Sequence, residues 1–463
     1  MGVMERQLGN MAILIPMLEQ IQNRFPGVQM VTSLQISQEF CSAHQICSLD
    51  IPAMYKPNIW AGFVSLFDWL RSRFFRLLED IFRVKAKFLL KGRKFKHLLE
   101  CDLYLDFSGD TYGDIAYWGH FIKHSIDLST IHNLRIPIML YAQSPGPFSS
   151  WLRRSVGRKI LNQIQVITIR ESEAYRNVNR LRIDCPVIQT ACPAWSLKPA
   201  PVEQVRAIVS AEGFRFFIHP LVGVNLTGFN FAENLTTSDK YKSRRPVNQI
   251  TPVIEVIGYL LDELKVNVVI IPHVYRLNTE GKMIPGPDGQ LSEQVYQMVN
   301  NSSIQNKERL MFIRGSYKVD EVKALIGQTD LMIAGRLHAG VGGMSQGIPT
   351  VLMAYSPKHH GFAQLAGLEN YVSNTFRGSF DKADIIHKVE HLWENRTEIS
   401  KQILERMDHI NELISLNQEV LAGLLASHIE TNQCISDESI KLWQERSYQI
   451  YQSLANTNGS SIN

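Results

Sequence analysis

The segment between residues 330 and 362 holds the side chains best suited to chemistry in this sequence. An apolar run at 331–334 ends at Gly335, and Arg336 and His338 then open a stretch rich in small residues. The free N–H groups of a helix that starts after a buried strand form an anion site. Arg336 adds a planar fork for a carboxylate or phosphate, and His338 can exchange a proton near neutral pH. The segment therefore predicts a site for an anionic small molecule.

A second apolar run, residues 350–353, would deliver further polar side chains to the same edge of the sheet. Tyr355, Ser356 and Lys358 follow it directly, and Lys358 adds a second cation. The alternative reading is structural: a buried histidine with satisfied hydrogen bonds, surrounded by surface cations.

Short apolar, β-branched runs alternate with amphipathic stretches along the chain, which predicts a parallel α/β sheet with crossover helices. A Pro-containing break near residues 198–204 divides the pattern. We expect an N-terminal Rossmann-like domain at 1–200, a C-terminal one at 201–380 and a helical tail at 381–463. The expected strands are 103–107, 136–141, 166–170, 214–219, 266–271, 331–334 and 350–353.

An ordered set of short sequences resembles the polysaccharide pyruvyl transferase family. The longest is RLHAGVGGMSQGIPTVLMAYSPKHHGF with TDLMIAG before it. The others are GNMAIL at 9–14, YAQSPGPF at 141–148, ITIRESEAY at 167–175, VGVNLTG at 222–228 and IIPHVY at 270–275. The resemblance spans residues 9 to 375. Family members usually have a buried strand before the Gly-Asn pair, and residues 1–8 are too few and too polar for it. We therefore expect either a start further upstream or the loss of this edge strand.

The resemblance implies a GT-B-like pair of Rossmann-like domains with the active site in the cleft between them. It implies transfer of pyruvate from phosphoenolpyruvate to sugar hydroxyls of a polysaccharide or its lipid-linked precursor, forming a ketal and releasing phosphate. The family's RxH pair falls on Arg336 and His338, its later lysine on Lys358 and its RExxS arginine on Arg170. All four would face phosphoenolpyruvate, and no metal ion or other cofactor is expected.

Phosphoenolpyruvate chemistry assigns further roles. The carbon C3 must be protonated, for which His338 is the first candidate and Lys358 the second. A sugar hydroxyl must lose a proton, and Asp110, Asp114 and His273 are the candidate acceptors.

Asp110 and Asp114 lie in a loop where many family members carry a glycine triplet, so we expect them to contact the sugar. Ser144 and Tyr355 are further expected substrate contacts, because each follows an expected strand.

Composition excludes several classes of protein. The chain has 463 residues, 45% of them apolar, so it is neither disordered, collagen-like nor a disulfide mini-protein. Its 48 Lys and Arg nearly balance 44 Asp and Glu, which does not favour a nucleic-acid binder. Six cysteines without a CxxC pair fit a reducing compartment, and Cys41, His44 and Cys47 lack a fourth zinc ligand. No signal peptide begins the chain, so we expect a cytoplasmic protein.

Residues 59–97 differ in kind from their surroundings. Apolar side chains recur in steps of three and four from Trp60 to Phe88, which predicts one long helix with an aromatic stripe. Ten basic and two acidic residues lie between Arg71 and Lys96. We expect this helix to lie on the inner, anionic surface of a membrane. One alternative is that the stripe packs on the core while the basic face is solvated. Another alternative, binding of nucleic acid, is supported by the positive charge alone.

Two other functions remain open at this point. A GT-B glycosyltransferase with a nucleotide-sugar donor would share the architecture, although no motif for ribose binding follows His338. A non-catalytic glycan-binding protein would have the same fold, and it would be favoured if Arg336, His338 and Lys358 did not line one cleft.

Overall fold

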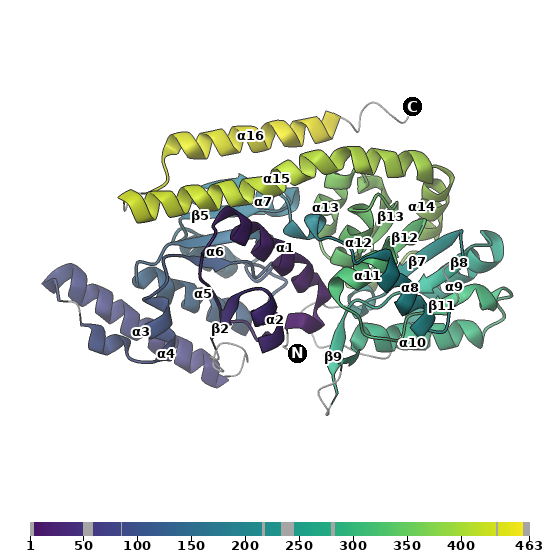
Figure 1. Cartoon of the computed structure of the whole chain (residues 1–463), viewed down its shortest axis with the longest axis horizontal. Helices are drawn as coiled ribbons and strands as arrows, with labels where there is room; N and C mark the ends of the chain where they lie inside the picture. The colour runs from purple at the N-terminus through teal and green to yellow at the C-terminus, as the bar shows by residue number, and fades with distance from the viewer. Residues whose placement is uncertain are drawn as a thin grey trace. The chain divides into compact units, whose positions relative to one another are not determined.

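The computed structural model describes residues 4–49, 59–84, 86–214, 218–232, 245–278, 283–431 and 434–456 (Figure 1). The chain forms two compact units. Unit 1 comprises Met1–Phe25, Ile36–His44 and Pro193–Asn411, and unit 2 comprises Pro26–Gln35, Gln45–Cys192 and Glu412–Asn463. The sequence analysis expected domains at 1–200, 201–380 and 381–463. In the structure, the first helix belongs to the unit that is formed mainly by residues after 192.

Unit 1 is built on a six-stranded parallel sheet of order β11-β8-β7-β12-β13-β14. Numbered along the chain, this order is 3-2-1-4-5-6, that of the doubly wound Rossmann fold. The strands are β7 (Leu221–Asn225), β8 (Asn267–Ile270), β11 (Leu310–Phe312), β12 (Leu331–Ala334), β13 (Thr350–Ala354) and β14 (Val372–Asn374). A separate antiparallel pair is formed by β9 (Tyr275–Leu277) and β10 (Met283–Pro285).

The central strands of unit 1 form where the sequence is continuously apolar. Every residue of β7, β12 and β13 is buried, as expected for parallel strands covered on both faces. The helices of unit 1 are α1 (Leu8–Arg24), α2 (Gln38–Ala43), α8 (Val202–Ala211), α9 (Val247–Gly258), α10 (Pro287–Asn300), α11 (Val319–Ile326), α12 (Leu337–Met344), α13 (Lys358–Ala366) and α14 (Lys382–Glu394). Two short 3-10 helices also enter the site described below, η4 (Pro193–Ser196) and η5 (Gly228–Phe231).

Unit 2 contains a four-stranded parallel sheet of order β3-β4-β5-β6. Its strands are β3 (Tyr104–Asp106), β4 (Ile138–Gln143), β5 (Val166–Ile169) and β6 (Val187–Gln189), and a small parallel pair joins β1 (Met30–Thr32) to β2 (Ile46–Ser48). Its helices are α3 (Ile59–Phe82), α4 (Arg93–Leu98), α5 (Trp118–Asn133), α6 (Trp151–Leu161), α7 (Ser172–Asn179) and α16 (Asp437–Asn456), with a 3-10 turn η3 (Lys87–Leu90). The 36-residue helix α15 (Arg396–Thr431) contributes its first part to unit 1 and the rest to unit 2.

Two elements expected from the sequence are corrected. The predicted strand 214–219 is wrong for its described residues, Phe214, Ile218 and His219, and 215–217 lie outside the described residues. The strand lies instead at Leu221–Asn225, which pairs with both β8 and β12. The predicted single helix at 59–97 ends at Phe82, because Arg83 has a positive φ of 55° and breaks the helical backbone. The expected helical C-terminal region is confirmed by α14, α15 and α16.

Candidate active site

The strand order of unit 1 reverses between β7 and β12, which are neighbours although more than 100 residues apart in sequence. In doubly wound sheets, ligands bind beyond the carboxyl ends of the strands at this point. There, Asn225 pairs with Ala334, and the backbone N–H of Gly335 donates to the carbonyl oxygen of Asn225 at 2.8 Å. A Cβ at position 335 would lie 2.9 Å from that carbonyl oxygen, so only glycine lets the chain pass. The turn thereby delivers Arg336 to the start of α12.

Arg336 holds a buried carboxylate. Its Nε and Nη2 donate to the two oxygens of Asp288 at 2.7 and 3.0 Å, and the Asp288 side chain is only 1% exposed. Thr227 donates to the same carboxylate at 3.1 Å, and the Arg336 guanidinium lies 4.8 Å from the centre of the Phe229 ring. One edge of the guanidinium is therefore committed to Asp288, a partner that the sequence did not reveal. The assignment of Arg336 to phosphoenolpyruvate stays a prediction.

The Tyr355 ring contacts both Phe229 and Lys358. The Tyr355 ring stacks on Phe229 at 4.6 Å between centroids, and Lys358 Nζ lies 5.9 Å from the centre of the Tyr355 ring. The structure thus brings Arg336 and Tyr355 against Phe229, and Lys358 against Tyr355. These contacts supply two cations beside a buried apolar platform.

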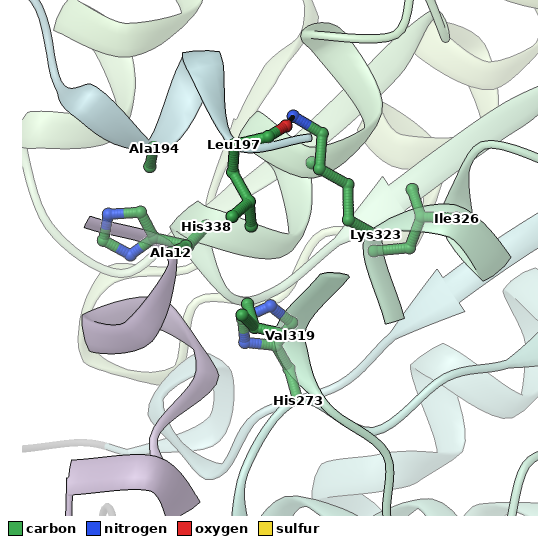
Figure 2. A pocket seen from close by; sticks show the side chains of 9 residues that line it. Ala12, Ala194, Leu197, His273, Val319, Lys323, Ile326 and His338 are labelled. Carbon is green, nitrogen blue, oxygen red and sulfur yellow. Dashed lines mark hydrogen bonds between the residues drawn. The ribbon is translucent and has the colours of Figure 1, made fainter. Parts of the chain in front are cut away.

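His338, in the first turn of α12, lines a small pocket within unit 1 (Figure 2). His273, which follows β8, and Lys323 of α11 line the same pocket, whose volume is about 10 Å³, room for about one water molecule. Apolar neighbours complete it: Ala12 of α1, Ala194 and Leu197 around η4, Val319 and Ile326 of α11, and Gly342 of α12. Two predicted site residues, His273 and His338, are therefore brought together, and Lys323 joins them.

Gly9 sets the position of the His338 ring. A Cβ at residue 9 would lie 2.8 Å from His338 Nδ1, closer than side chains tolerate. The GNMAIL segment does not form a turn here but the first turns of α1, which brings Gly9 against the imidazole. We expect Gly9→Ala to displace the ring and lower turnover on the order of tenfold or more, because misplacing a reacting group is costly.

Steady-state kinetics of Gly9→Ala would measure this effect, with thermal unfolding measured in parallel. Gly119→Ala on α5 is the matched control, since no heavy atom lies within 4 Å of its added Cβ. Equal turnover for Gly9→Ala and Gly119→Ala would show that the position of the His338 ring does not limit the reaction.

His273 is neutral in this site. Burial, and then the nearby positive charge of Arg336, lower the pKa of its imidazole to about 3. The side chain is 4% exposed. Such a group can direct a hydrogen bond at a substrate, but an imidazole with so low a pKa is a weak base, which favours another acceptor for the sugar proton.

Lys323 was missed at the level of sequence. Its Nζ donates to the backbone carbonyl oxygens of Leu197 at 2.5 Å and Trp195 at 3.4 Å, and burial lowers the pKa of its amine to about 7. The signal was available: Val319, Val322 and Ile326 form the apolar face of α11, and Lys323 lies on it. A lysine at a core position of an amphipathic helix marks a buried amine.

The amine of Lys323 predicts a pH-dependent stability. Between about pH 7 and its ordinary pKa of 10.5, the unfolded chain holds a proton on Lys323 that the folded chain has released. The free energy of unfolding therefore rises with pH across this window, and below pH 7 the cost of burying the charge is fully present. We expect wild type to lose stability relative to Lys323→Met as the pH falls from 10 to 7. Urea unfolding of both proteins at several pH values would measure this loss. If the difference in the free energy of unfolding between the two proteins did not change with pH, the two carbonyl groups would keep the amine charged.

Two further predicted residues meet in unit 2, at the carboxyl ends of β4 and β5. Arg170 Nε donates to Ser144 Oγ at 2.7 Å, and Nη1 donates to Cys192 Sγ at 3.8 Å. Gly109 lies beside them with a φ of 80°, and a Cβ there would be 3.5 Å from Arg170 Nη2. Arg170 is 2% exposed, so its charge is held in a buried polar setting.

The two predicted carboxylates of unit 2 differ in their surroundings. Asp114 accepts a hydrogen bond from the Ser149 backbone at 2.8 Å and lies 3.5 Å from Arg153 Nε, contacts that hold a loop together. Asp110 is half-buried in the loop after β3, and its charge acts on His120. Asp110 thus remains the better placed of the two for a substrate.

Asp106, at the end of β3, is a buried carboxylate that the sequence analysis did not single out. It accepts hydrogen bonds from Tyr112 Oη at 2.5 Å, Gln143 Nε2 at 3.1 Å and the Ser108 backbone at 2.7 Å, and lies 2.9 Å from His124 Nε2. Burial alone would raise its pKa, but the charge of His124 and the hydrogen bonds from His124, Tyr112 and the Ser108 backbone lower it to about 2. Burial alone would lower the pKa of the His124 imidazole, but the negative charge of Asp106 and its hydrogen bond raise it above the ordinary value. Asp106 and His124 thus form a charged pair, and the hydrogen bond from Tyr112 to Asp106 connects this pair to the 109–114 loop.

Residues 8–357 match the model of the polysaccharide pyruvyl transferase family. The chain belongs to this family. The match includes every predicted site residue except Lys358, which follows its last residue directly, and the family name supports a polysaccharide pyruvyl transferase. No curated protein sequence matches the chain. Among the described residues, no three His, Cys, Asp or Glu side chains are grouped so as to hold a metal ion.

Solved structures share the fold at low sequence identity. UDP-GlcNAc 2-epimerase from Neisseria meningitidis, bound to UDP-GlcNAc, is 14% identical with a TM-score of 0.52, over 89% of this chain and 96% of its own. A putative UDP-N-acetylglucosamine 2-epimerase from Listeria monocytogenes is 12% identical with a TM-score of 0.54, over 94% and 97%. Anabaena Alr3699/HepE, in complex with UDP and glucose, is 9% identical with a TM-score of 0.51, over 88% and 94%. These similarities confirm the predicted GT-B-like α/β fold class.

Proposed function

We propose that the chain transfers the pyruvyl group of phosphoenolpyruvate to two hydroxyls of a sugar in a polysaccharide or its lipid-linked precursor. The observation that carries the proposal is the set of side chains at the β7–β12 switch of unit 1. Arg336 and Lys358 supply positive charge, and His338 lines an adjoining pocket. Membership of the pyruvyl transferase family supports the same chemistry.

The reaction needs an anion site and a proton donor. In the proposed mechanism the cations Arg336 and Lys358 hold the carboxylate and phosphate of the donor. His338 gives a proton to C3, which turns the methylene into a methyl group and makes C2 electrophilic. C2 then forms two bonds to sugar oxygens while its bond to the phosphate oxygen breaks. One hydroxyl proton goes to the departing phosphate and the other to the base. The base then releases its proton to solvent, and His338 takes one up from solvent before the next turnover.

Unit 2 holds further predicted substrate residues. Arg170 and Ser144 are proposed as donor contacts, and Asp110 as the carboxylate that receives a hydroxyl proton. Asp114 is a weaker candidate because Arg153 and the Ser149 backbone already engage it. His273 would orient the substrate as a neutral hydrogen-bonding group.

Release of inorganic phosphate from phosphoenolpyruvate tests the proposal. Purified protein is incubated with phosphoenolpyruvate and polymeric or lipid-linked glycans, and phosphate and acid-labile glycan-bound pyruvate are measured together. The proposal expects equal amounts of both products.

The solved neighbours in complex with UDP or UDP-sugars make a nucleotide-sugar donor the alternative to test. A parallel reaction with UDP-sugars measures release of UDP. UDP release without phosphate release would favour a glycosyltransferase, and glycan binding with neither product would favour a non-catalytic glycan-binding protein; both would overturn the proposal.

A further inference from the structure

Helix α3 of unit 2 carries an apolar face that the described part of the chain leaves uncovered. We call this set of side chains the apolar face of α3: Trp60, Phe63, Phe67, Leu70, Phe74, Leu77 and Ile81. Each is between 43% and 75% exposed. Val84 and Phe88, which continue the spacing beyond the helix, are 51% and 66% exposed. The alternative that this stripe packs on the core is therefore wrong.

The opposite face of α3 fixes the helix to unit 2. Ala61, Ser65, Asp68, Ser72 and Phe75 are buried, and Phe75 joins the apolar core of the unit. Asn133 of α5 donates to Ser72 Oγ at 3.0 Å, and Lys94 of α4 lies 3.2 Å from a carboxylate oxygen of Asp68. The apolar face cannot turn inward without breaking these contacts. It is a stable surface of the unit.

The basic residues of this segment fall into two groups. Arg71, Arg76 and Lys94 are structural: Arg71 donates to the carbonyl oxygen of Leu89 at 2.6 Å, and Arg76 to that of His132 at 2.9 Å. The other described basic residues are exposed at the surface: Arg73, Arg83, Lys87, Lys91, Arg93 and Lys96. Their positive charge accompanies the apolar face along α3, η3 and α4.

We propose that the apolar face of α3 binds the surface of an anionic lipid bilayer. The aromatic and aliphatic side chains would enter the boundary between headgroups and acyl chains, while the exposed Arg and Lys side chains contact anionic headgroups. Large exposed apolar patches beside polar residues mark protein or membrane contact sites. No helix in the described residues is long and apolar enough to cross a membrane, so the proposed mode is attachment at the surface.

Charge favours a bilayer over a second copy of the chain. If two apolar faces paired, exposed Arg73, Arg83 and Lys87 of each copy would approach the same charges of the other, and like charges oppose association. The exposed apolar surface is also wider than the narrow seam of a coiled coil, because Val64 and Leu66 beside the stripe are 44% and 41% exposed. An anionic surface complements both features.

Flotation with lipid vesicles tests the proposal on the full chain. We expect binding to vesicles of phosphatidylcholine and phosphatidylglycerol at low salt, weaker binding at 0.5 M salt, and little binding to phosphatidylcholine alone. Trp60→Ala with Phe67→Ala and Phe74→Ala should abolish binding without lowering the unfolding temperature, because all three side chains are exposed. The matched control is Trp151→Ala with Leu442→Ala and Tyr448→Ala, exposed apolar residues elsewhere in unit 2, which should bind as wild type does.

A charge variant tests the basic contribution separately. Arg73→Glu with Lys87→Glu and Arg93→Glu should weaken binding to anionic vesicles by at least on the order of 100-fold, since each basic residue near such a surface contributes to affinity. Arg158→Glu with Lys159→Glu and Arg180→Glu, also exposed in unit 2, makes the same change in net charge elsewhere and should retain most of the binding.

Three results would overturn the proposal. They are absence of vesicle binding by wild type, equal binding to neutral and anionic vesicles, or a dimer in solution that the Trp60, Phe67 and Phe74 substitutions convert to monomer. The last would make the face an interface between copies. None of these outcomes depends on the pyruvyl transfer reaction, so the two proposals fail separately.

Discussion

Substituting His338 by Gln is expected to lower turnover by roughly 10² to 10⁴ while phosphoenolpyruvate still binds, the loss typical of a missing general acid. Glutamine keeps a polar side chain of similar reach but cannot deliver a proton at neutral pH. The positive charges of Arg336 and Lys358 would remain to hold the donor. Kinetics with phosphoenolpyruvate and a competent glycan, together with equilibrium binding of the donor, measure the two effects separately.

The unfolding temperature is the control for His338→Gln. His338 is only partly buried and packs edge-on against Phe362, with 6.3 Å between ring centroids, so the variant should fold. A folded His338→Gln protein that works within about threefold of wild type would remove His338 from the mechanism. The acid role would then move to Lys358.

Arg336→Ala is expected to lower the free energy of unfolding by about 3–5 kcal/mol, because it leaves the carboxylate of Asp288 buried without its charged partner. The Asp288 side chain is 1% exposed and loses two hydrogen bonds, at 2.7 and 3.0 Å. Denaturant unfolding of the variant measures this loss. Any reduction in phosphoenolpyruvate affinity must be measured under conditions where the variant is fully folded.

Two companion variants separate charge from geometry at this position. Arg336→Lys retains a positive charge without the two parallel hydrogen bonds, so its loss should be smaller. Arg336→Ala combined with Asp288→Ala removes both charges, and should recover part of the stability lost by Arg336→Ala alone. If Arg336→Ala were as stable as wild type, the Asp288 pair would contribute nothing to the stability of the fold.

Much of the sheet in each unit could be predicted from the sequence, because its central strands are continuously apolar. The ranges 331–334 and 350–353 match β12 and β13 almost residue for residue. Strand β7 was displaced because FRFFIH is richer in strand-favouring residues than VGVN, although only the latter lies between β8 and β12. Strands β6, β11 and β14 were missed, because runs of three residues rarely show a detectable period, whereas β3, also three residues long, was predicted within the longer range 103–107.

The candidate site could be predicted only in part. Arg336, His338, Tyr355 and Lys358 could be singled out from the sequence because they follow two neighbouring strands closely, and their roles stay predictions. Asp288 lies 48 residues from Arg336, and only the folded sheet brings the two together. Long-range pairing of this kind leaves no local pattern in a single sequence.

Unit 1 is assembled from segments that lie far apart in the order of synthesis. Helix α1 packs against η4, α11 and α12, none of which exists until at least residue 193 has been added. At typical elongation rates, about 10 to 30 seconds pass between the completion of α1 and the synthesis of η4. During that interval the apolar side chains of Leu8, Met11, Ile13 and Leu14, all buried in the finished unit, have no core to enter. The growing chain therefore exposes this apolar helix while the later segments are being made, and Gly9 reaches its position beside His338 only after residue 338 has been added.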